Sequence, residues 1–175
     1  MNKRERFNQE IEIENAQLRF KNFSGKPGKY NAEGNRNFCV ILDDKDAAEK
    51  LAAAGWNVKW LRARDETEED LPYIQVKVQY QEGHKPPEIW LITECDGELI
   101  RKTPIGESQV DILDWAEIKR VDLTINPYNW TNAKGESGIK GYLKRMYVII
   151  TQDKFASKYV NVPDSAISSV TGVEN

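Results

Sequence analysis

The chain has 175 residues, 39% of them hydrophobic and 10% aromatic, which is typical of a globular protein and excludes an intrinsically disordered one. Its 25 basic and 28 acidic residues give a net charge of −3, which argues against a uniformly basic surface. Residues 1–64 nevertheless carry 13 basic and 9 acidic residues, enough for a local basic patch. No apolar run approaches the about 18 residues of a membrane span, and the start MNKRERFNQE lacks the apolar stretch of a signal peptide.

The length predicts one domain with loosely packed ends. We expect a flexible N-terminus over residues 1–9, a folded domain over residues 10–152, and a tail over residues 153–175 with a short helix at 154–159. Both cysteines lack CxxC spacing and a His neighbour, so we expect two reduced thiols and no metal site.

The first part of the domain alternates as a strand over residues 10–20, with a kink at 15–16. A Gly-rich, basic loop follows over residues 23–37 and lacks the GKS/T ending of a nucleotide-binding loop. It is either a loop that brings backbone amides close to a phosphate or a mobile loop with solvated lysines, and both readings stay open.

A short apolar strand over residues 37–42, with Cys39 in the core, leads into an Ala-rich helix over residues 43–55. Asp43 or Asp44 can cap its start, and Gly55 stands at its end. A docking helix is therefore expected between two strands.

Residues 56–61 return to strand and place Trp56 and Trp60 on one face, which is more typical of core residues than of a stacking platform. Arg62 and Arg64 follow, and then the acidic run DETEED, which we expect to be a solvated loop.

Residues 71–80 give the clearest alternation in the chain, with an apolar inward row at Ile74, Val76 and Val78. The outward row of one aromatic, two amides and a cation either stacks and hydrogen-bonds bases or is an ordinary solvated face. A turn with the single His84, a strand over residues 88–93 and a polar hairpin or loop over residues 94–106 complete this part.

Residues 110–151 organise the rest of the chain. A compact apolar turn precedes two long alternating runs, 119–130 and 139–150, joined by a polar, Gly-containing tip at 131–138; this predicts a long β-hairpin. Aromatic rings and lysines share its far end, which suggests a surface for single-stranded nucleic acid. Ordinary polar decoration of a hairpin is the alternative.

Some six or seven strands with one clear helix predict a mainly β fold, namely an OB-fold-like small antiparallel barrel with a short helix and a long β-hairpin. This step rests on analogy and does not by itself give a function.

Four carboxylates, Asp111, Asp114, Glu117 and Asp122, are the candidates for a metal-dependent nuclease site. Because apolar residues alternate with these carboxylates in the sequence, we interpret the carboxylates as the solvent-exposed side of an amphipathic turn. The sequence contains no Ser-His-Asp set, HExxH or dinucleotide motif, and only one His. We therefore expect a binding protein rather than an enzyme, with no metal and no cofactor.

Six stretches resemble a family common in tailed bacteriophages, whose members are usually described as single-stranded DNA-binding proteins with an OB-type fold: LRFKNFSGKPGKYNAEGNRNFCVIL, GWNVKWLRAR, YIQVKVQY, PPEIWLIT, VDILDWAEIKRVDLTINPYNW and GIKGYLKRMYVII. The resemblance spans about residues 11–163 and implies protection of unpaired phage DNA during replication or recombination. The end VTGVEN lacks the dense acidic tip that bacterial single-stranded DNA-binding proteins use to recruit partners.

We therefore predict a sequence-tolerant single-stranded DNA-binding protein of the host cytoplasm that binds through a basic groove with aromatic stacking. Replication or recombination proteins and a second copy of the chain are candidate partners, and no membrane is. The alternative is a non-enzymatic phage interaction or assembly module on a β scaffold. The predicted DNA-binding residues are Lys26, Lys29, Tyr30, Arg36, Lys59, Arg62, Arg64, Tyr73, Lys77, Tyr128, Trp130, Lys134, Lys140, Tyr142 and Lys144.

Overall fold

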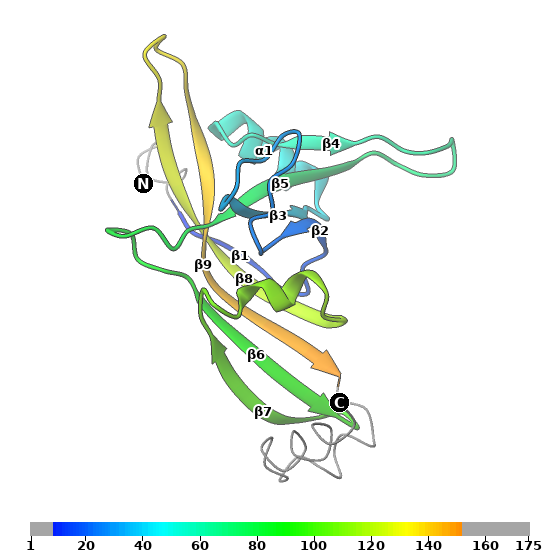
Figure 1. Ribbon diagram of the computed structural model, residues 1–175. Coiled ribbons are helices and arrows are strands. Elements are labelled where there is room, and N and C mark those ends of the chain that lie inside the picture. The colour runs from blue at the N-terminus through cyan, green and yellow to red at the C-terminus, as the bar shows by residue number, and fades with distance from the viewer. Residues whose placement is uncertain (1–8, 152–175) are drawn as a thin grey trace.

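The computed structural model describes residues 9–151 (Figure 1). This part of the chain forms nine strands, one α-helix and one 3₁₀-helix. The elements are β1 (Ile11–Ile13), β2 (Leu18–Asn22), β3 (Arg36–Ile41), α1 (Lys45–Ala54), β4 (Lys59–Leu61), β5 (Leu71–Val78), β6 (Glu88–Cys95), β7 (Glu98–Ile105), η1 (Val110–Asp114), β8 (Ile118–Thr131) and β9 (Ser137–Thr151). The predictions of a flexible terminus and of a helix at 154–159 fall outside the described residues.

Helix α1 follows from its capping residues. The Asp44 carboxylate accepts hydrogen bonds from the backbone amides of Asp46 and Ala47, at 2.9 and 3.3 Å. Gly55 ends the helix with φ 113°, a left-handed conformation that glycine adopts without steric cost. The predicted helix between two strands is confirmed.

Strand β9 is the centre of the sheet, whose main order is β1-β8-β9-β5-β3-β2. It pairs with β8 along its whole length, antiparallel, and so forms the predicted long hairpin. On its other side it pairs first with β5 and then with β6, both parallel. A strand of 15 residues is long enough to serve two partners in succession.

The mainly β fold with a short helix and a long hairpin is thus confirmed. The sheet, however, is mixed rather than antiparallel and does not close into a barrel within the described residues. The reason is that β6 and β7 leave the line of β5 and extend the sheet along the second half of β9, as Figure 1 shows below the centre of the molecule.

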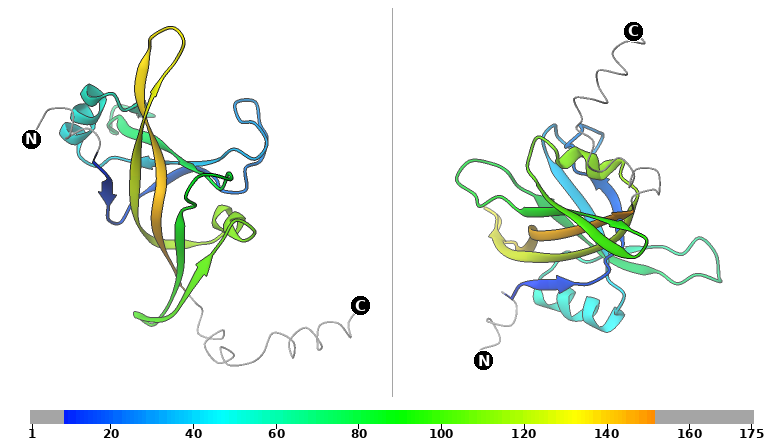
Figure 2. Two further views of the ribbon diagram at one scale, coloured as in Figure 1. Left: turned by 90° about the vertical axis from the view of Figure 1, so that its left-hand side faces the viewer. Right: turned by 90° about the horizontal axis from the view of Figure 1, so that it is seen from below.

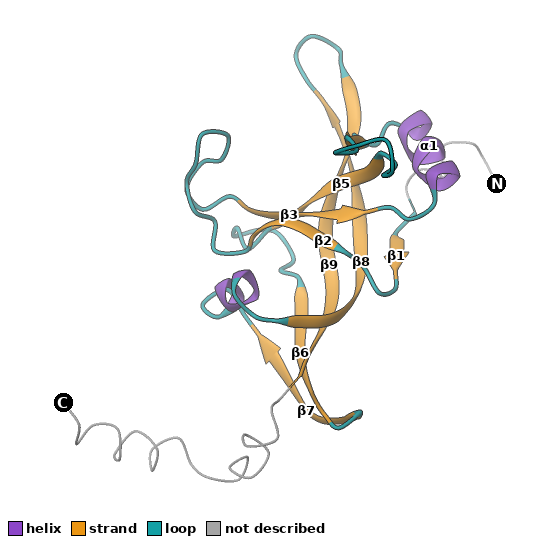
Figure 3. Ribbon diagram, turned by 90° about the vertical axis from the view of Figure 1, so that its right-hand side faces the viewer, coloured by secondary structure: helices purple, strands orange, loops and turns teal. Residues whose placement is uncertain are grey.

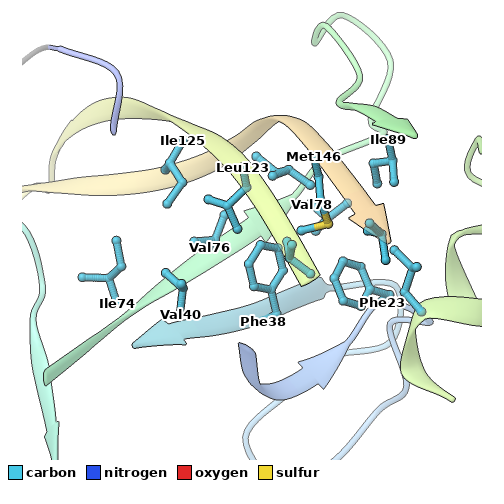
Figure 4. Close-up of a cluster of buried hydrophobic side chains, with 14 of the residues drawn as sticks. Phe23, Phe38, Val40, Ile74, Val76, Val78, Ile89, Leu123, Ile125 and Met146 are labelled. Atoms are coloured by element: carbon cyan, nitrogen blue, oxygen red, sulfur yellow. The ribbon is translucent and has the colours of Figure 1, made fainter. Parts of the chain in front are cut away.

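The core lies on one side of the sheet and is built from the inward rows of β3, β5, β8 and β9 (Figure 4). The rings of Phe23 and Phe38 stack at its centre, with centroids 5.1 Å apart. Each such buried side chain stabilises the fold by about 1.5–3 kcal/mol. Ala48 of α1 and Leu113 of η1 also join the core, and Figure 3 shows the two helices far apart, α1 at the upper right and η1 at the left.

Several local expectations can be compared with the structure. The predicted kink falls at Asn15, which has φ 50°. Trp56 is a core residue at 5% exposure, as expected, but Trp60 is 42% exposed. The two rings do not share a face because β4 begins only at Lys59, so Trp56 lies outside the strand.

Cys39 is buried, and Cys39 and Cys95 are both free thiols in the described structure. No helix within residues 9–151 is long and apolar enough to cross a membrane.

Candidate nucleic-acid interface

The tip of the β8–β9 hairpin is fixed by its own sequence. The Asn132 side chain accepts hydrogen bonds from the backbone amides of Lys134 and Glu136, each at 3.0 Å. Gly135 supplies the positive φ of 80° that the turn requires. The hairpin therefore projects beyond the rest of the sheet with the exposed Lys134 at its end (Figure 2).

Strand register joins the predicted residues into one surface, which we call the outer face. Tyr128 lies opposite Lys140 and Tyr142 lies opposite Lys77, while Tyr73 lies opposite Lys59. Residues that lie opposite one another share a face of the sheet, and so do alternate residues of one strand. The members of the outer face among the predicted residues are Lys59, Tyr73, Lys77, Tyr128, Trp130, Lys140 and Tyr142.

Trp130 lies directly over the backbone of Gly138, its partner across the hairpin. A Cβ atom on Gly138 would stand 2.8 Å from the Trp130 ring, so only glycine leaves room for this placement. Lys140 Nζ is 5.8 Å from the ring centroid. Counting the register outward from the tip would have placed this glycine beneath the ring, and it is a site residue that the sequence reasoning missed.

Lys77 and Lys140 face each other across a cleft of about 570 Å³ between β5 and the hairpin, which Trp130 also lines. Burial, and then the positive charge of Lys140, lowers the pKa of the Lys77 ammonium below its ordinary value. Neither lysine forms an ion pair within residues 9–151. The cleft thus holds two uncompensated cations next to an indole ring.

A second hollow, of about 420 Å³, lies beside Tyr128 and Tyr142. The two rings meet edge to face, with centroids 5.6 Å apart and an 81° interplanar angle, and Tyr128 is 53% exposed. Burial, and then Tyr128, raises the pKa of the Tyr142 hydroxyl. The sequence analysis set aside His84 as a turn residue and did not consider Lys85, but the β5–β6 connection brings both to this hollow.

The loop between β2 and β3 is held in place by asparagines. Asn31 accepts hydrogen bonds from the side chains of Asn35 and Asn37, each at 3.0 Å, and donates one to the Lys26 carbonyl at 2.8 Å. This network favours an ordered loop over a mobile one. Tyr30 projects from it fully into solvent.

The predicted cations of this loop have different surroundings. Lys26 Nζ lies 5.3 Å from the Trp115 ring, and Lys29 Nζ lies 5.4 Å from the Tyr30 ring. Arg36 is half-buried, pairs with Glu107 at 3.7 Å and stands 5.7 Å from the Tyr80 ring. Of these three cations, Arg36, at the start of β3, is the one with a carboxylate partner within residues 9–151.

Three further predicted residues lie at the ends of the outer face. Arg62 and Arg64 follow β4 and border a hollow of about 530 Å³. Lys144 borders the hollow at Tyr142, but its ammonium pairs with Glu10.

The four carboxylates considered for a nuclease do not converge. Asp114 accepts hydrogen bonds from the backbone amides of Phe23 and Ser24, at 2.7 and 3.0 Å, and so anchors the start of the β2–β3 loop. Asp122 accepts one from the Asn15 amide at 2.8 Å. Within residues 9–151 no group of three or more His, Cys, Asp or Glu side chains is placed to hold a metal ion.

Comparison with protein families gives one match that covers the chain. Residues 1–174 match the profile of the family described as "Putative phage ssDNA-binding domain". The chain belongs to this family. The resemblance that the sequence analysis drew to phage single-stranded DNA-binding proteins is thereby confirmed.

Three of the solved structures that are similar to this phage ssDNA-binding domain are proteins of bacteriophages Enc34 and T7. The C-terminally truncated single-stranded DNA-binding protein of bacteriophage Enc34 has 13% identity and a TM-score of 0.48, covering 82% of this chain and 87% of its own. The Enc34 protein in a second structure has 12% identity and a TM-score of 0.47, covering 83% of each chain. For gp2.5, the single-stranded DNA-binding protein of bacteriophage T7, the identity is 10% and the TM-score 0.34, over 89% of this chain and 94% of that one. No curated protein sequence matches this chain.

Proposed function

We propose that this phage ssDNA-binding domain is a non-enzymatic, sequence-tolerant single-stranded DNA-binding protein that acts in phage DNA replication or recombination in the host cytoplasm. The single-stranded DNA runs along the outer face, between the hairpin and β5. Lysines neutralise its phosphates, and its bases stack on exposed rings.

The observation that carries the proposal is that Lys77 and Lys140, beside Trp130, have no carboxylate partner within residues 9–151. Burial is the main cause of the lowered pKa of Lys77, and the positive charge of Lys140 adds to it, so the cleft disfavours the two ammonium groups when it is empty. A phosphate between them compensates both charges and turns an unfavourable arrangement into a binding site. Stacking of a base on an aromatic ring adds about 1–3 kcal/mol and does not depend on base identity, which fits a sequence-tolerant protein.

The direct test is the binding of fluorescently labelled oligo-dT to the full chain, followed by anisotropy over a range of salt concentrations. We expect tight binding at low salt that weakens linearly in a log–log plot, with a slope of about −0.7 for each phosphate that the protein neutralises. Unlabelled oligo-dA and mixed-sequence competitors should displace the probe with similar strength. Absence of binding at low salt refutes the proposal, and degradation of the DNA in magnesium or manganese refutes its non-enzymatic part.

A phage interaction or assembly module remains the second candidate, because strand β7 pairs only with β6 within the described residues. Its side chains Leu99 and Ile100 are exposed at that edge. An exposed apolar edge strand can pair with another chain. Oligo-dT binding by a chain that stays monomeric in light scattering favours the first candidate; a stable oligomer without DNA binding favours the second.

A further inference from the structure

Phe20 is an aromatic residue in an unusual conformation. Its φ is 51°, a value that bulky residues rarely adopt, and its side chain is 61% exposed. The pairing of β2 with β3 shifts between Arg19 and Asn22, so Phe20 sits on a bulge. Bulges re-aim side chains, and strained residues of this kind concentrate at functional sites.

The Phe20 ring stands at the edge of the hollow of about 530 Å³ that follows β4. It lies 6.0 Å from the Tyr73 ring, with the planes tilted by 60°. Leu61 and Leu71 supply the apolar side of the hollow, and Leu71 is itself exposed. A flat apolar group therefore has an exposed ring and aliphatic surface to pack against.

The rim of this hollow carries more positive than negative charge. Three arginines line it and form no ion pair within residues 9–151: Arg19, Arg62 and Arg64. Two acidic residues, Glu68 and Glu69, also line the hollow. Glu69 forms its ion pair with Lys45, at 2.8 Å, and not with an arginine. Glu68 accepts a weak 3.4 Å hydrogen bond from the Arg64 amide, and Asp70, next to the hollow, accepts one from the Ala63 amide at 2.7 Å. These two carboxylates offset part of the positive charge of the arginines. Guanidinium groups around an apolar floor suit a flat ring that carries phosphates on either side.

The hollow is continuous with the outer face. Tyr73, which touches Phe20, lies on the same face of β5 as Gln75 and Lys77, because these are alternate residues of the strand. Lys77 lies four residue steps along β5 from Tyr73, a distance of about 13 Å. A DNA strand that is bound at the Lys77–Lys140 cleft can therefore reach Phe20 within a few nucleotides.

We propose that Phe20 is a base-stacking subsite at the far end of the same DNA path, an inference that rests on the function proposed above. An unpaired nucleobase stacks on the Phe20 ring, and the three arginines contact the phosphates next to it. The strained backbone keeps the ring outside the core, where a base can reach it. A protein partner would use the same exposed ring, but the arginine rim and the continuity with the outer face favour DNA.

The test compares Phe20→Asn with Phe20→Tyr in the full chain. Asparagine tolerates a positive φ better than other non-glycine residues, so the Asn variant should keep or raise the thermal midpoint while it loses the ring. We expect its affinity for long oligo-dT to fall about tenfold, and that of the Tyr variant to stay within about twofold. A lower thermal midpoint with unchanged affinity makes Phe20 a structural residue and overturns the proposal.

A length series of oligo-dT separates this inference from the proposed function. For the wild type we expect an added increase in affinity at the length that reaches Phe20, and for Phe20→Asn we expect that step to be missing while shorter oligonucleotides bind as before. If the two proteins bind alike at every length, the Phe20 subsite is refuted and the proposed function stands. If the wild type binds no oligonucleotide, both are refuted.

Discussion

The two halves of the β8–β9 hairpin share two strands but differ in how their charges are used. We call the part from Ile125 and Leu143 to the tip the distal half, and the rest the proximal half; a register shift after Thr124 divides them. In the distal half, Lys134 and Lys140 have no carboxylate partner within residues 9–151. In the proximal half every basic side chain has one, in the pairs Lys119–Glu94 at 2.7 Å, Arg120–Asp122 at 3.2 Å, Arg145–Glu88 at 2.9 Å and Lys144–Glu10.

The difference separates a scaffold from a surface that is open to a polyanion. Beside the proximal half, β6 covers one edge of β9, and Lys102 lies 4.3 Å from the Trp90 ring and 5.7 Å from the Tyr147 ring. Rings and cations are thus present in both halves. Among the basic residues of the hairpin itself, only those of the distal half lack a carboxylate partner within residues 9–151. The local charge balance of the hairpin, rather than its number of basic residues, therefore marks the candidate interface.

The largest effect should come from removing the ring that lies over the hairpin backbone. For Trp130→Ala we expect oligo-dT binding to weaken by about 1–3 kcal/mol, because one stacking surface is removed. The thermal midpoint should change little, since Trp130 lies outside the hydrophobic core. Fluorescence anisotropy and a thermal melt of the same preparation measure the two quantities.

The matched control is Tyr147→Ala, which removes a ring from the proximal half. We expect a less stable protein with unchanged affinity. Equal decreases of affinity in both variants would show that the two halves do not differ as DNA surfaces.

The next effect concerns the lysines that neutralise phosphates. Replacing Lys77 or Lys140 by Met should flatten the log–log salt dependence of binding by about 0.7 for each phosphate that is no longer neutralised. Lys119→Met, which removes an ammonium that has a carboxylate partner, should leave the slope unchanged. Titrations at four or more salt concentrations give the slopes, and a flattened slope in the Lys119 variant would contradict the contrast between the halves.

A smaller effect is expected from converting one paired cation of the proximal half into a free one. Glu88 and Arg145 form an ion pair and both border the hollow at Tyr142. Glu88→Gln should therefore free the Arg145 guanidinium to contact the DNA. We expect binding to tighten by about 0.5–1 kcal/mol at low salt. Asp122→Asn frees Arg120 away from this hollow and should leave affinity unchanged; a similar increase there would mean that net charge alone sets affinity.

Within single strands, the sequence was enough to predict the faces. The alternation over β5 correctly placed Ile74 and Val76 in the core, and the hairpin with its tip is where the pattern put it. Local chemistry decides these features, since alternation and turn residues act over a few positions. The same holds for α1, which Asp44 and Gly55 delimit.

Between strands, the sequence could not predict the partners. Nothing local indicates that β5 runs parallel to β9, yet that register places Lys77 opposite Tyr142 and close to Lys140. The bulge that turns Phe20 outward is likewise a result of how β2 pairs with β3. Long-range pairing is set by the whole core, so the candidate site was predictable as a set of residues but not as a geometry.

The smallest effect tests that geometry through the stability of the free protein. The lowered pKa of Lys77 means that the folded state disfavours its charge, so Lys77→Met should raise the free energy of unfolding at neutral pH, by at most about 0.5 kcal/mol. The cost of the charge is fully present below the lowered pKa and disappears as pH rises from there to the ordinary value of 10.5, so the added stability should vanish across that window. Because burial is the larger cause and Lys140 the second, the added stability should shrink, but persist, in a Lys140→Met background. Denaturant melts at several pH values measure it, and an added stability that is independent of pH would show that the two lysines do not share the cleft as charged groups.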